Sequence, residues 1–213
     1  MDTKHLPLGV CVLTSSGFIP GRGHLEVGLA AVEGGADAVQ LRAPELSDEE
    51  LLPLAIEIGD ACRRSGVVFV VNDRVDVAVR SGADGVHLGQ DDDLEGARDR
   101  LGPECVLGVS VGTPAEARAA EEAGADYLGV VVWATATKPE AVPRGLDGLR
   151  AVVDAVGIPV VGIGSVDASN AGEVLAAGAA GVAVVSAVGA AEDPAAATRE
   201  LASAVSEWKA GKR

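Results

Sequence analysis

The chain has 213 residues, of which 48% are hydrophobic, so it is long enough to bury a substantial core in one domain. Its formal net charge is −15, which argues against nucleic acid and against an anionic membrane surface as binding partners. The three cysteines, Cys11, Cys62 and Cys105, are far apart and match no metal-binding spacing, which predicts free thiols in a reducing, cytoplasmic compartment.

Patterns typical of strands and helices alternate along the chain. Apolar runs rich in β-branched residues predict strands at residues 8–13, 38–41, 67–72, 85–88, 106–109, 127–132, 158–163 and 181–185. Amphipathic patterns predict helices at residues 24–33, 47–62, 114–122, 168–177 and 194–208. Ser47 and Glu50 form a capping box, which fixes the start of the second of these helices. The strands are continuously apolar, which indicates a parallel sheet buried on both faces.

A short repeat precedes every second predicted strand. Gly-Ala-Asp occurs at residues 35–37, 82–84 and 124–126, and Gly-Ala-Ala occurs at residues 178–180. Glycine just after a helix adopts the left-handed conformation without steric cost, so each copy marks the end of a helix. Eight strands alternating with helices are the number that closes a (β/α)8 TIM barrel, and we expect one such α/β domain over residues 1–213. A doubly wound open sheet is the alternative.

Acidic side chains follow the third and fourth predicted strands. Asn72 and Asp73 come at the end of one strand, and Gln90 and Asp92 follow the next. Active-site residues of α/β barrels gather at the carboxyl ends of the strands, so Asp73 and Asp92 are expected to lie close together. Mg²⁺ binds one or two carboxylates together with substrate phosphate oxygens, and the pair therefore predicts a Mg²⁺ site. The alternative is that each aspartate caps the helix that follows it.

Other polar residues lie in or just after the remaining strands. Gln40 and Arg42 alternate with Leu41, so both point to the opposite side, which is inward in a barrel. An inward arginine needs an anionic ligand or a structural ion-pair partner, and this segment alone does not separate the two. Ser110 ends the fifth strand, where a lone serine is more often a helix cap or a core hydroxyl. His87 lies inside the fourth strand and reads as a hydrogen-bonded core histidine.

Two groups of anion-binding donors follow the sixth, seventh and eighth strands. Thr135, Thr137 and Lys138 form a compact set of donors for phosphate oxygens. Glycine-rich residues 162–165 and the pair 185–186 offer backbone N–H groups, and barrels often bind a phosphate after strands seven and eight. A metal-chelated pyrophosphate and a separate phosphomonoester would satisfy both groups.

At these residues the chain resembles the thiamine phosphate synthase family, over about residues 8–188. The motifs that carry the resemblance are Gln40-Leu41-Arg42, Asn72-Asp73-Arg74, residues 85–92, Gly108-Val109-Ser110, Thr135-Ala136-Thr137-Lys138 and residues 161–164. The resemblance implies a barrel transferase of thiamine biosynthesis that couples hydroxymethylpyrimidine pyrophosphate to thiazole phosphate and releases pyrophosphate. The implied chemistry is dissociative and depends on Mg²⁺.

The resemblance also implies roles for individual residues. Metal ligands would be Asp73 and Asp92. Catalytic groups would be Arg42, Ser110 and Lys138. Contacts to the pyrimidine pyrophosphate would come from Gln40, Arg42, Asn72, Ser110 and Lys138. Contacts to the thiazole phosphate would come from Thr135, Thr137, Ser165, Val185 and Ser186. Leu41, Ala43, Pro44 and Ala136 are further expected substrate-binding residues.

The chain departs from the family pattern at three places. Pro44 stands where the family usually has lysine, which removes one cation from the pyrophosphate site; Arg22 and Arg144 are candidates to replace it. Residues 130–133 lack the usual Gly-Pro and make the turn one residue shorter. Ser165 stands where the family has a second glycine; its N–H can bind phosphate if φ is negative, and its hydroxyl would add a donor.

Two other functions are weighed against the synthase. A related thiazole tautomerase has the same architecture but uses a histidine soon after strand five and lacks the paired carboxylates. Here Ser110 is followed by Val111 and Gly112, and both aspartates are present. A non-catalytic thiazole phosphate binder is suggested by Pro44 and the altered turn.

The expected partners are small phosphorylated substrates, without nucleic acid or membrane. No apolar run spans a bilayer and residues 1–8 show no signal-peptide pattern, so we expect a cytoplasmic protein. The oligomeric state is left open, with a homo-oligomer among the options.

Overall fold

The computed structural model describes residues 6–211, and within this range strands and helices alternate as the sequence predicts. The strands are β1 (Val10–Leu13), β2 (Ala38–Leu41), β3 (Val68–Asn72), β4 (Gly85–Leu88), β5 (Val106–Ser110), β6 (Tyr127–Val131), β7 (Val160–Ile163) and β8 (Gly181–Val184). The helices are α1 (His24–Glu33), α2 (Asp48–Ser65), α3 (Val75–Ser81), α4 (Leu94–Leu101), α5 (Pro114–Glu122), α6 (Gly145–Val153), α7 (Ala171–Ala176), α8 (Ser186–Gly189) and α9 (Pro194–Gly211).

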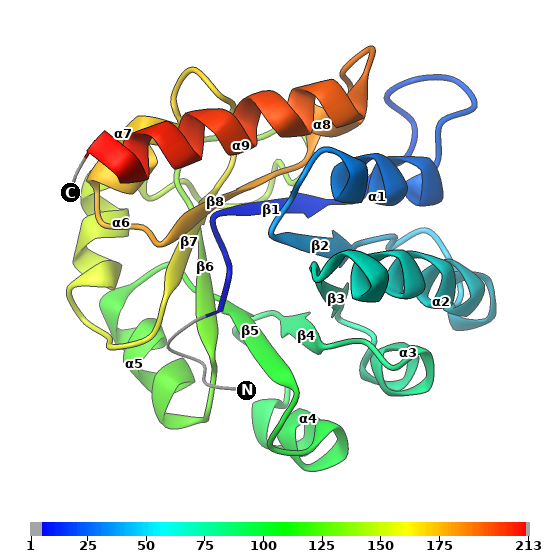
Figure 1. Cartoon of the computed structure of the whole chain (residues 1–213). Coiled ribbons are helices and arrows are strands. Elements are labelled where there is room, and N and C mark those ends of the chain that lie inside the picture. Colours follow the sequence, from blue (N-terminus) through cyan, green and yellow to red (C-terminus); the bar gives the residue numbers. More distant parts are fainter. Residues whose placement is uncertain (1–5, 212–213) are drawn as a thin grey trace.

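The strands form a closed parallel barrel in chain order. Each strand pairs in parallel with the next, and β8 pairs with β1, where Val12 lies opposite Val184. The helices surround the strands, and α9 lies across the outside near β1 and β8 (Figure 1). The predicted (β/α)8 TIM barrel is therefore confirmed, and the open doubly wound sheet is wrong because the edge strands pair with each other.

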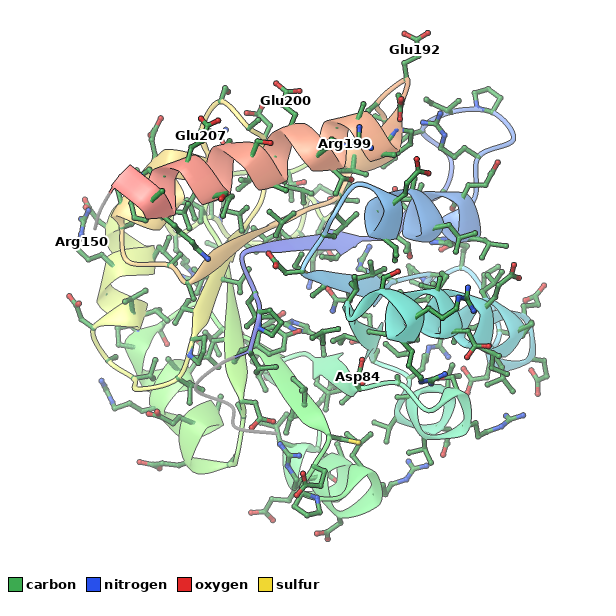
Figure 2. All side chains as sticks on the ribbon, in the orientation of Figure 1. Asp84, Arg150, Glu192, Arg199, Glu200 and Glu207 are labelled. Carbon is green, nitrogen blue, oxygen red and sulfur yellow. The ribbon has the colours of Figure 1, made fainter. Side chains whose placement is uncertain are left out.

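The Gly-Ala-Asp repeat has a structural role beyond ending helices. The carboxylates of Asp37, Asp84 and Asp126 each accept a hydrogen bond of 2.8 Å from a backbone N–H of the preceding strand. The backbone N–H of each aspartate donates in return to the carbonyl of the same strand residue. Asp84, labelled at the start of β4 in Figure 2, thereby holds β4 to Phe69 of β3. The repeat thus sets the register of strand pairs at the end of the barrel opposite the expected site.

Two apolar regions hold the barrel together. The larger fills the space between strands and helices and includes Leu41, Ile58 and Leu128. The smaller fills the barrel interior with side chains that include Val70 and Tyr127. Because most of this inner packing is apolar, polar side chains such as Asn72 and Ser110 lie at the end where their strands finish.

The boundaries differ from the predicted ones at several places. The strands expected at residues 8–13 and 158–163 begin two residues later, because only residues facing a neighbouring strand join the ladder. Helix α9 continues to Gly211, and its outer face carries Glu200 and Glu207, which point away from the barrel (Figure 2). Within the described residues, none of the helices combines the length and the apolar character that a bilayer crossing needs.

Candidate active site

A cavity of about 110 Å³ opens where the strands end. Its walls come from every strand of the barrel or from the loop that follows it. The predicted site residues that line it are Gln40, Arg42, Asn72, Ser110, Thr135, Thr137, Lys138, Ser165, Val185 and Ser186. Folding therefore brings together residues that are as far as 146 positions apart (186 − 40) in the sequence.

Asp73 and Asp92 lie at the same end of neighbouring strands, as predicted. Partial burial and the nearby Asp92 carboxylate raise the pKa of Asp73, whereas Arg42, Lys138 and Arg74 act to lower it. These influences require the two carboxylates and the cations to lie near one another. Asp92 is exposed, and its Oδ2 accepts a hydrogen bond of 2.7 Å from the Gly89 N–H.

The helix-cap interpretation of the two aspartates is wrong. The cap position of α3 is Arg74, and that of α4 is Asp93, whose carboxylate accepts from the Gly96 N–H at 3.0 Å. Asp73 instead has φ of 62°, and the N–H of Arg74 donates to the carbonyl of Asn72, two residues back. A three-residue turn with positive φ is strained for a residue with a side chain, and such strain gathers at functional sites.

The residues expected around the pyrophosphate occupy neighbouring positions. Gln40 is buried and its side-chain N–H donates to the side-chain oxygen Oδ1 of Asn72 at 3.2 Å. The backbone N–H of Arg42 donates to Thr14 at 3.1 Å, which fixes the chain just after β2. Leu41 faces the opposite way, into the apolar layer under the helices, as the alternation predicted.

Three residues of the expected set do not present side chains to the cavity. Ala43 is buried against the outer apolar layer, whereas Pro44 and Ala136 are exposed on loops. For these residues, and for Leu41, only the backbone is available for a ligand contact.

The loop after β6 presents its two threonines side by side. The hydroxyls of Thr135 and Thr137 are 2.9 Å apart, and the Thr137 N–H donates to the Thr135 hydroxyl at 3.3 Å. The Ser165 hydroxyl donates to the carbonyl of Ala134 at 2.5 Å, which ties this loop to the loop after β7. The expectation that the Ser165 hydroxyl adds a free donor is therefore wrong.

Ser165 has a backbone conformation that is typical of glycine. Its φ is 50°, in the left-handed region, so the condition of a negative φ is not met. Gly164 before it has φ of 103° and packs against the Trp133 carbonyl. After β8, the chain enters the short helix α8 at Ser186, whose first N–H groups lack partners within the helix.

The comparisons with known proteins agree on one family. The family described as thiamine monophosphate synthase matches residues 10–188. A thiamine-phosphate synthase of Natronomonas pharaonis is 50% identical over 202 residues, which cover 92% of this chain and 94% of that protein. One of Moorella thermoacetica is 53% identical over 184 residues and covers 85% and 88%.

The chain belongs to the thiamine monophosphate synthase family. Its fold superimposes on the solved thiamine phosphate pyrophosphorylase of Pyrococcus furiosus with a TM-score of 0.87 at 40% identity, covering 95% of this chain and 98% of the other.

Arg22 and Arg144 are the arginines expected to supply a cation in place of the lysine expected at position 44. Arg22 is engaged elsewhere, because its guanidinium donates to the carbonyls of Ala191 and Glu192. The Arg144 guanidinium packs against Gly112 after β5, and its buried Nε has no partner among the described residues. Neither arginine is among the charges that act on Asp73.

Arg74 does act on Asp73. The two residues are adjacent in sequence, and the Arg74 guanidinium also forms an ion pair with Asp48 at 3.0 Å. We therefore regard Arg74, with Arg42 and Lys138, as a cation of this rim. The sequence alone does not predict this role of Arg74, because in Asn72-Asp73-Arg74 only Asn72 and Asp73 carry the oxygen atoms that indicate a metal site.

Sequence analysis also missed the partners of the two described histidines. His87 lines the cavity, with Tyr127 Oη and Ser110 Oγ each 2.9 Å from one of its ring nitrogens. Burial, with a smaller effect of Lys138, lowers the pKa of His87 to about 4, so it is neutral at physiological pH. His24 is buried and lies 3.0 Å from the Thr14 hydroxyl and 2.7 Å from Glu45. No local sequence signal marks contacts of such long separation.

Proposed function

We propose that this chain is a thiamine-phosphate synthase, which joins hydroxymethylpyrimidine pyrophosphate to thiazole phosphate and releases pyrophosphate. The observation that carries the proposal is the gathering of Asp73, Asp92, Arg42 and Lys138 beside one cavity. Curated relatives about 50% identical over nearly the whole chain carry the same name. The activity is that of an alkyl transferase of thiamine biosynthesis.

The two aspartates fit a Mg²⁺ ion. No cluster of three or more metal-binding side chains occurs among residues 6–211, but Mg²⁺ commonly takes only one or two carboxylates and completes its shell with water and phosphate. Partial burial and then the Asp92 carboxylate raise the pKa of Asp73, and a divalent cation held by both aspartates would relieve their repulsion. When bound, the ion would neutralise charge on the pyrophosphate.

The main role of the protein side chains is to stabilise the leaving pyrophosphate. Pyrophosphate leaves the methylene carbon of the pyrimidine, with its bonding electron pair, and a resonance-stabilised cation remains. Arg42 and Lys138 lie where they can bind the departing oxygens, and Ser110 lies nearby in the same cavity. Fixed donors aimed at developing negative charge lower the barrier because they need no reorganisation.

The second substrate is held for attack by its phosphate. Thr135 and Thr137 supply hydroxyls on one side, and backbone N–H groups at Gly164 and at Ser186 supply donors on the other. The thiazole nitrogen then attacks the carbon cation, and holding the two rings together provides an effective concentration. Bond formation needs no general base, in keeping with a neutral His87.

We also propose a cellular location and a set of ligands for this protein. Cys11 and Cys62 are buried free thiols and Cys105 is a half-buried free thiol, as expected for a protein of the reducing cytoplasm. We expect small phosphorylated substrates and Mg²⁺ as its ligands, and neither nucleic acid nor membrane.

One assay tests the function. Purified protein is incubated with both substrates, with Mg²⁺ and with EDTA, and thiamine phosphate and pyrophosphate are measured. We expect product only with Mg²⁺, and a loss of at least about 100-fold in Asp92→Ala, whose thermal unfolding stays cooperative. Full metal-free activity in that variant would contradict the assigned role. Interconversion of thiazole phosphate isomers without pyrimidine would indicate the tautomerase, and binding without turnover would indicate a non-catalytic binder.

A further inference from the structure

Three side chains form a hydrogen-bonded chain across three neighbouring strands. His87 of β4 lies with Nδ1 2.9 Å from the Tyr127 hydroxyl of β6 and with Nε2 2.9 Å from the Ser110 hydroxyl of β5. The centroids of the His87 and Tyr127 rings are 5.4 Å apart, and the ring planes are tilted by 44°. We infer that Tyr127 and His87 are positioning residues that commit Ser110 to donate its hydroxyl hydrogen to the bound pyrimidine pyrophosphate. This inference rests on the proposed function.

Two glycines make the chain possible. Gly108 lies between His87 and Tyr127 in register, on the intervening strand β5. A Cβ at Gly108 would come within 2.5 Å of the Tyr127 hydroxyl oxygen, so a larger residue would prevent the tyrosine from reaching across the strand. A Cβ at Gly129 would lie 3.2 Å from His87 Cε1. The barrel interior is therefore shaped around these contacts.

The direction of the hydrogen bonds follows from the tyrosine. Tyr127 is 5% exposed, and burial raises its pKa well above the usual value, so the phenol keeps its proton. Its hydroxyl has one described partner, His87 Nδ1, and a buried O–H that donates to nothing is costly. Tyr127 therefore donates to Nδ1, which leaves the ring proton on Nε2, facing Ser110.

This polarity decides what Ser110 can offer a ligand. With Nε2–H donating to the Ser110 oxygen, the serine hydrogen cannot point back at the histidine. It is free to donate into the cavity that Ser110 lines beside Lys138. If Nε2 were instead an acceptor, the hydroxyl hydrogen would turn inward and the ligand would meet only a lone pair. Ser110 thus recognises a hydrogen-bond acceptor on the ligand. The hydrogen bond that it donates becomes stronger as negative charge develops on the leaving group.

The kinetic test removes only the tyrosine oxygen. Tyr127→Phe keeps the ring over Gly108, and the proposal predicts that kcat falls about tenfold while the pyrimidine KM changes less than about twofold. In a Ser110→Ala background the same substitution is expected to change kcat less than about twofold, because its effect passes through the serine. An equal loss in both backgrounds would overturn the proposal. Thermal unfolding of each variant checks the fold.

A spectroscopic test needs no activity. The chain has three histidines, so ¹⁵N signals of the His87 ring can be assigned by their loss in His87→Gln. In the free protein we expect the Nε2–H form, and in Tyr127→Phe we expect the Nδ1–H form to become populated. A wild-type ring protonated on Nδ1 would overturn the proposal. If the ring has the expected form but wild-type protein makes no thiamine phosphate, the proposed function fails while the hydrogen-bond chain stands.

A rescue experiment separates positioning from packing. The amide N–H of Gln at position 87 can still donate to Ser110, whereas Leu cannot. We expect His87→Gln to retain at least about fivefold more kcat than His87→Leu at similar thermal stability. Equal kcat in the two variants, with both folded, would show that His87 acts only by filling space.

Discussion

At the scale of single residues, Asp73 shows how local strain and charge are placed together. Its φ of 62° is uncommon for a residue with a side chain, although aspartate tolerates the left-handed region better than most. This conformation sends the chain directly from β3 into α3 and leaves the carboxylate at the rim with Asp92. The repulsion between the two carboxylates disfavours the free protein, and a cation bound to both would relieve it.

Replacing Asp73 by Asn tests this directly. Asn keeps the tolerance of positive φ and removes the repulsion from Asp92, so without metal the melting temperature should stay equal or rise by about 1–2 °C. Saturating Mg²⁺ should raise the melting temperature of wild-type protein but not that of the variant. Differential scanning calorimetry with and without Mg²⁺ measures both effects.

Asp91→Asn is the matched control, because Asp91 is an exposed neighbour of Asp92 that is outside the proposed pair. A Mg²⁺-dependent stabilisation that persists in Asp73→Asn would exclude Asp73 as a ligand.

At the scale of elements, the loop after β2 is held in place by hydrogen bonds to residues outside the loop. The carboxylate of Glu45 lies 2.7 Å from His24 of α1 and accepts from the Ser16 hydroxyl at 2.6 Å. His24 is also 3.0 Å from Thr14, which accepts from the Arg42 N–H. Two loops and a helix start are thereby joined, and Arg42 is fixed at the cavity although Pro44 supplies no cation.

The pKa of Glu45 gives this network a measurable signature. Partial burial alone would raise the pKa, but hydrogen bonds from Ser16 and His24 outweigh it and lower the pKa to about 2. A carboxyl with a lowered pKa stabilises the fold above its usual pKa and loses that contribution as the pH falls through the folded value. Glu45→Gln should therefore lower the melting temperature by about 1–2 °C at pH 7, a small effect because Glu45 is half exposed.

Thermal unfolding followed by circular dichroism from pH 7 to pH 2 checks the prediction. The difference between wild type and Glu45→Gln should shrink as the pH falls from about 4.5 toward 2. Glu57→Gln on the exposed face of α2 serves as the control and should change little at any pH. A difference for Glu45→Gln that is independent of pH would exclude the ionic contribution.

At the scale of the whole molecule, the site exists only because the barrel closes. Val182 of β8 donates its N–H to the Gly9 carbonyl at 2.9 Å, and β8 pairs with β1 beyond it. A Cβ at Gly181 would overlap the carbonyl oxygen of Leu8, so the seam requires glycine here. Closure brings the loops after β7 and β8 to the same mouth as Arg42.

Gly181→Ala should therefore destabilise the protein by about 3 kcal/mol or more, since backbone atoms on both sides must move. Urea unfolding followed by circular dichroism gives the free energy. Gly157→Ala is the control, because its Cβ would meet only the end of the Glu121 side chain, at 3.3 Å, and should cost less than about 0.5 kcal/mol. A neutral Gly181→Ala would show that the seam can open.

The sequence by itself determined the strand count, the parallel sheet and the end of the barrel where the expected site residues gather. Those features depend on local patterns, such as apolar runs and the repeated glycine before every second strand, that extend over a few neighbouring residues. It also placed Asp73 and Asp92 at one rim, because Asp73 directly follows β3 and Asp92 lies in the short segment after β4. Only the tertiary structure decided which side chains face one another across strands: Tyr127 reaches His87 over Gly108, and His24 reaches Glu45 across two loops. The reason is physical, because barrel closure sets these contacts through register and packing, which no short stretch of sequence encodes.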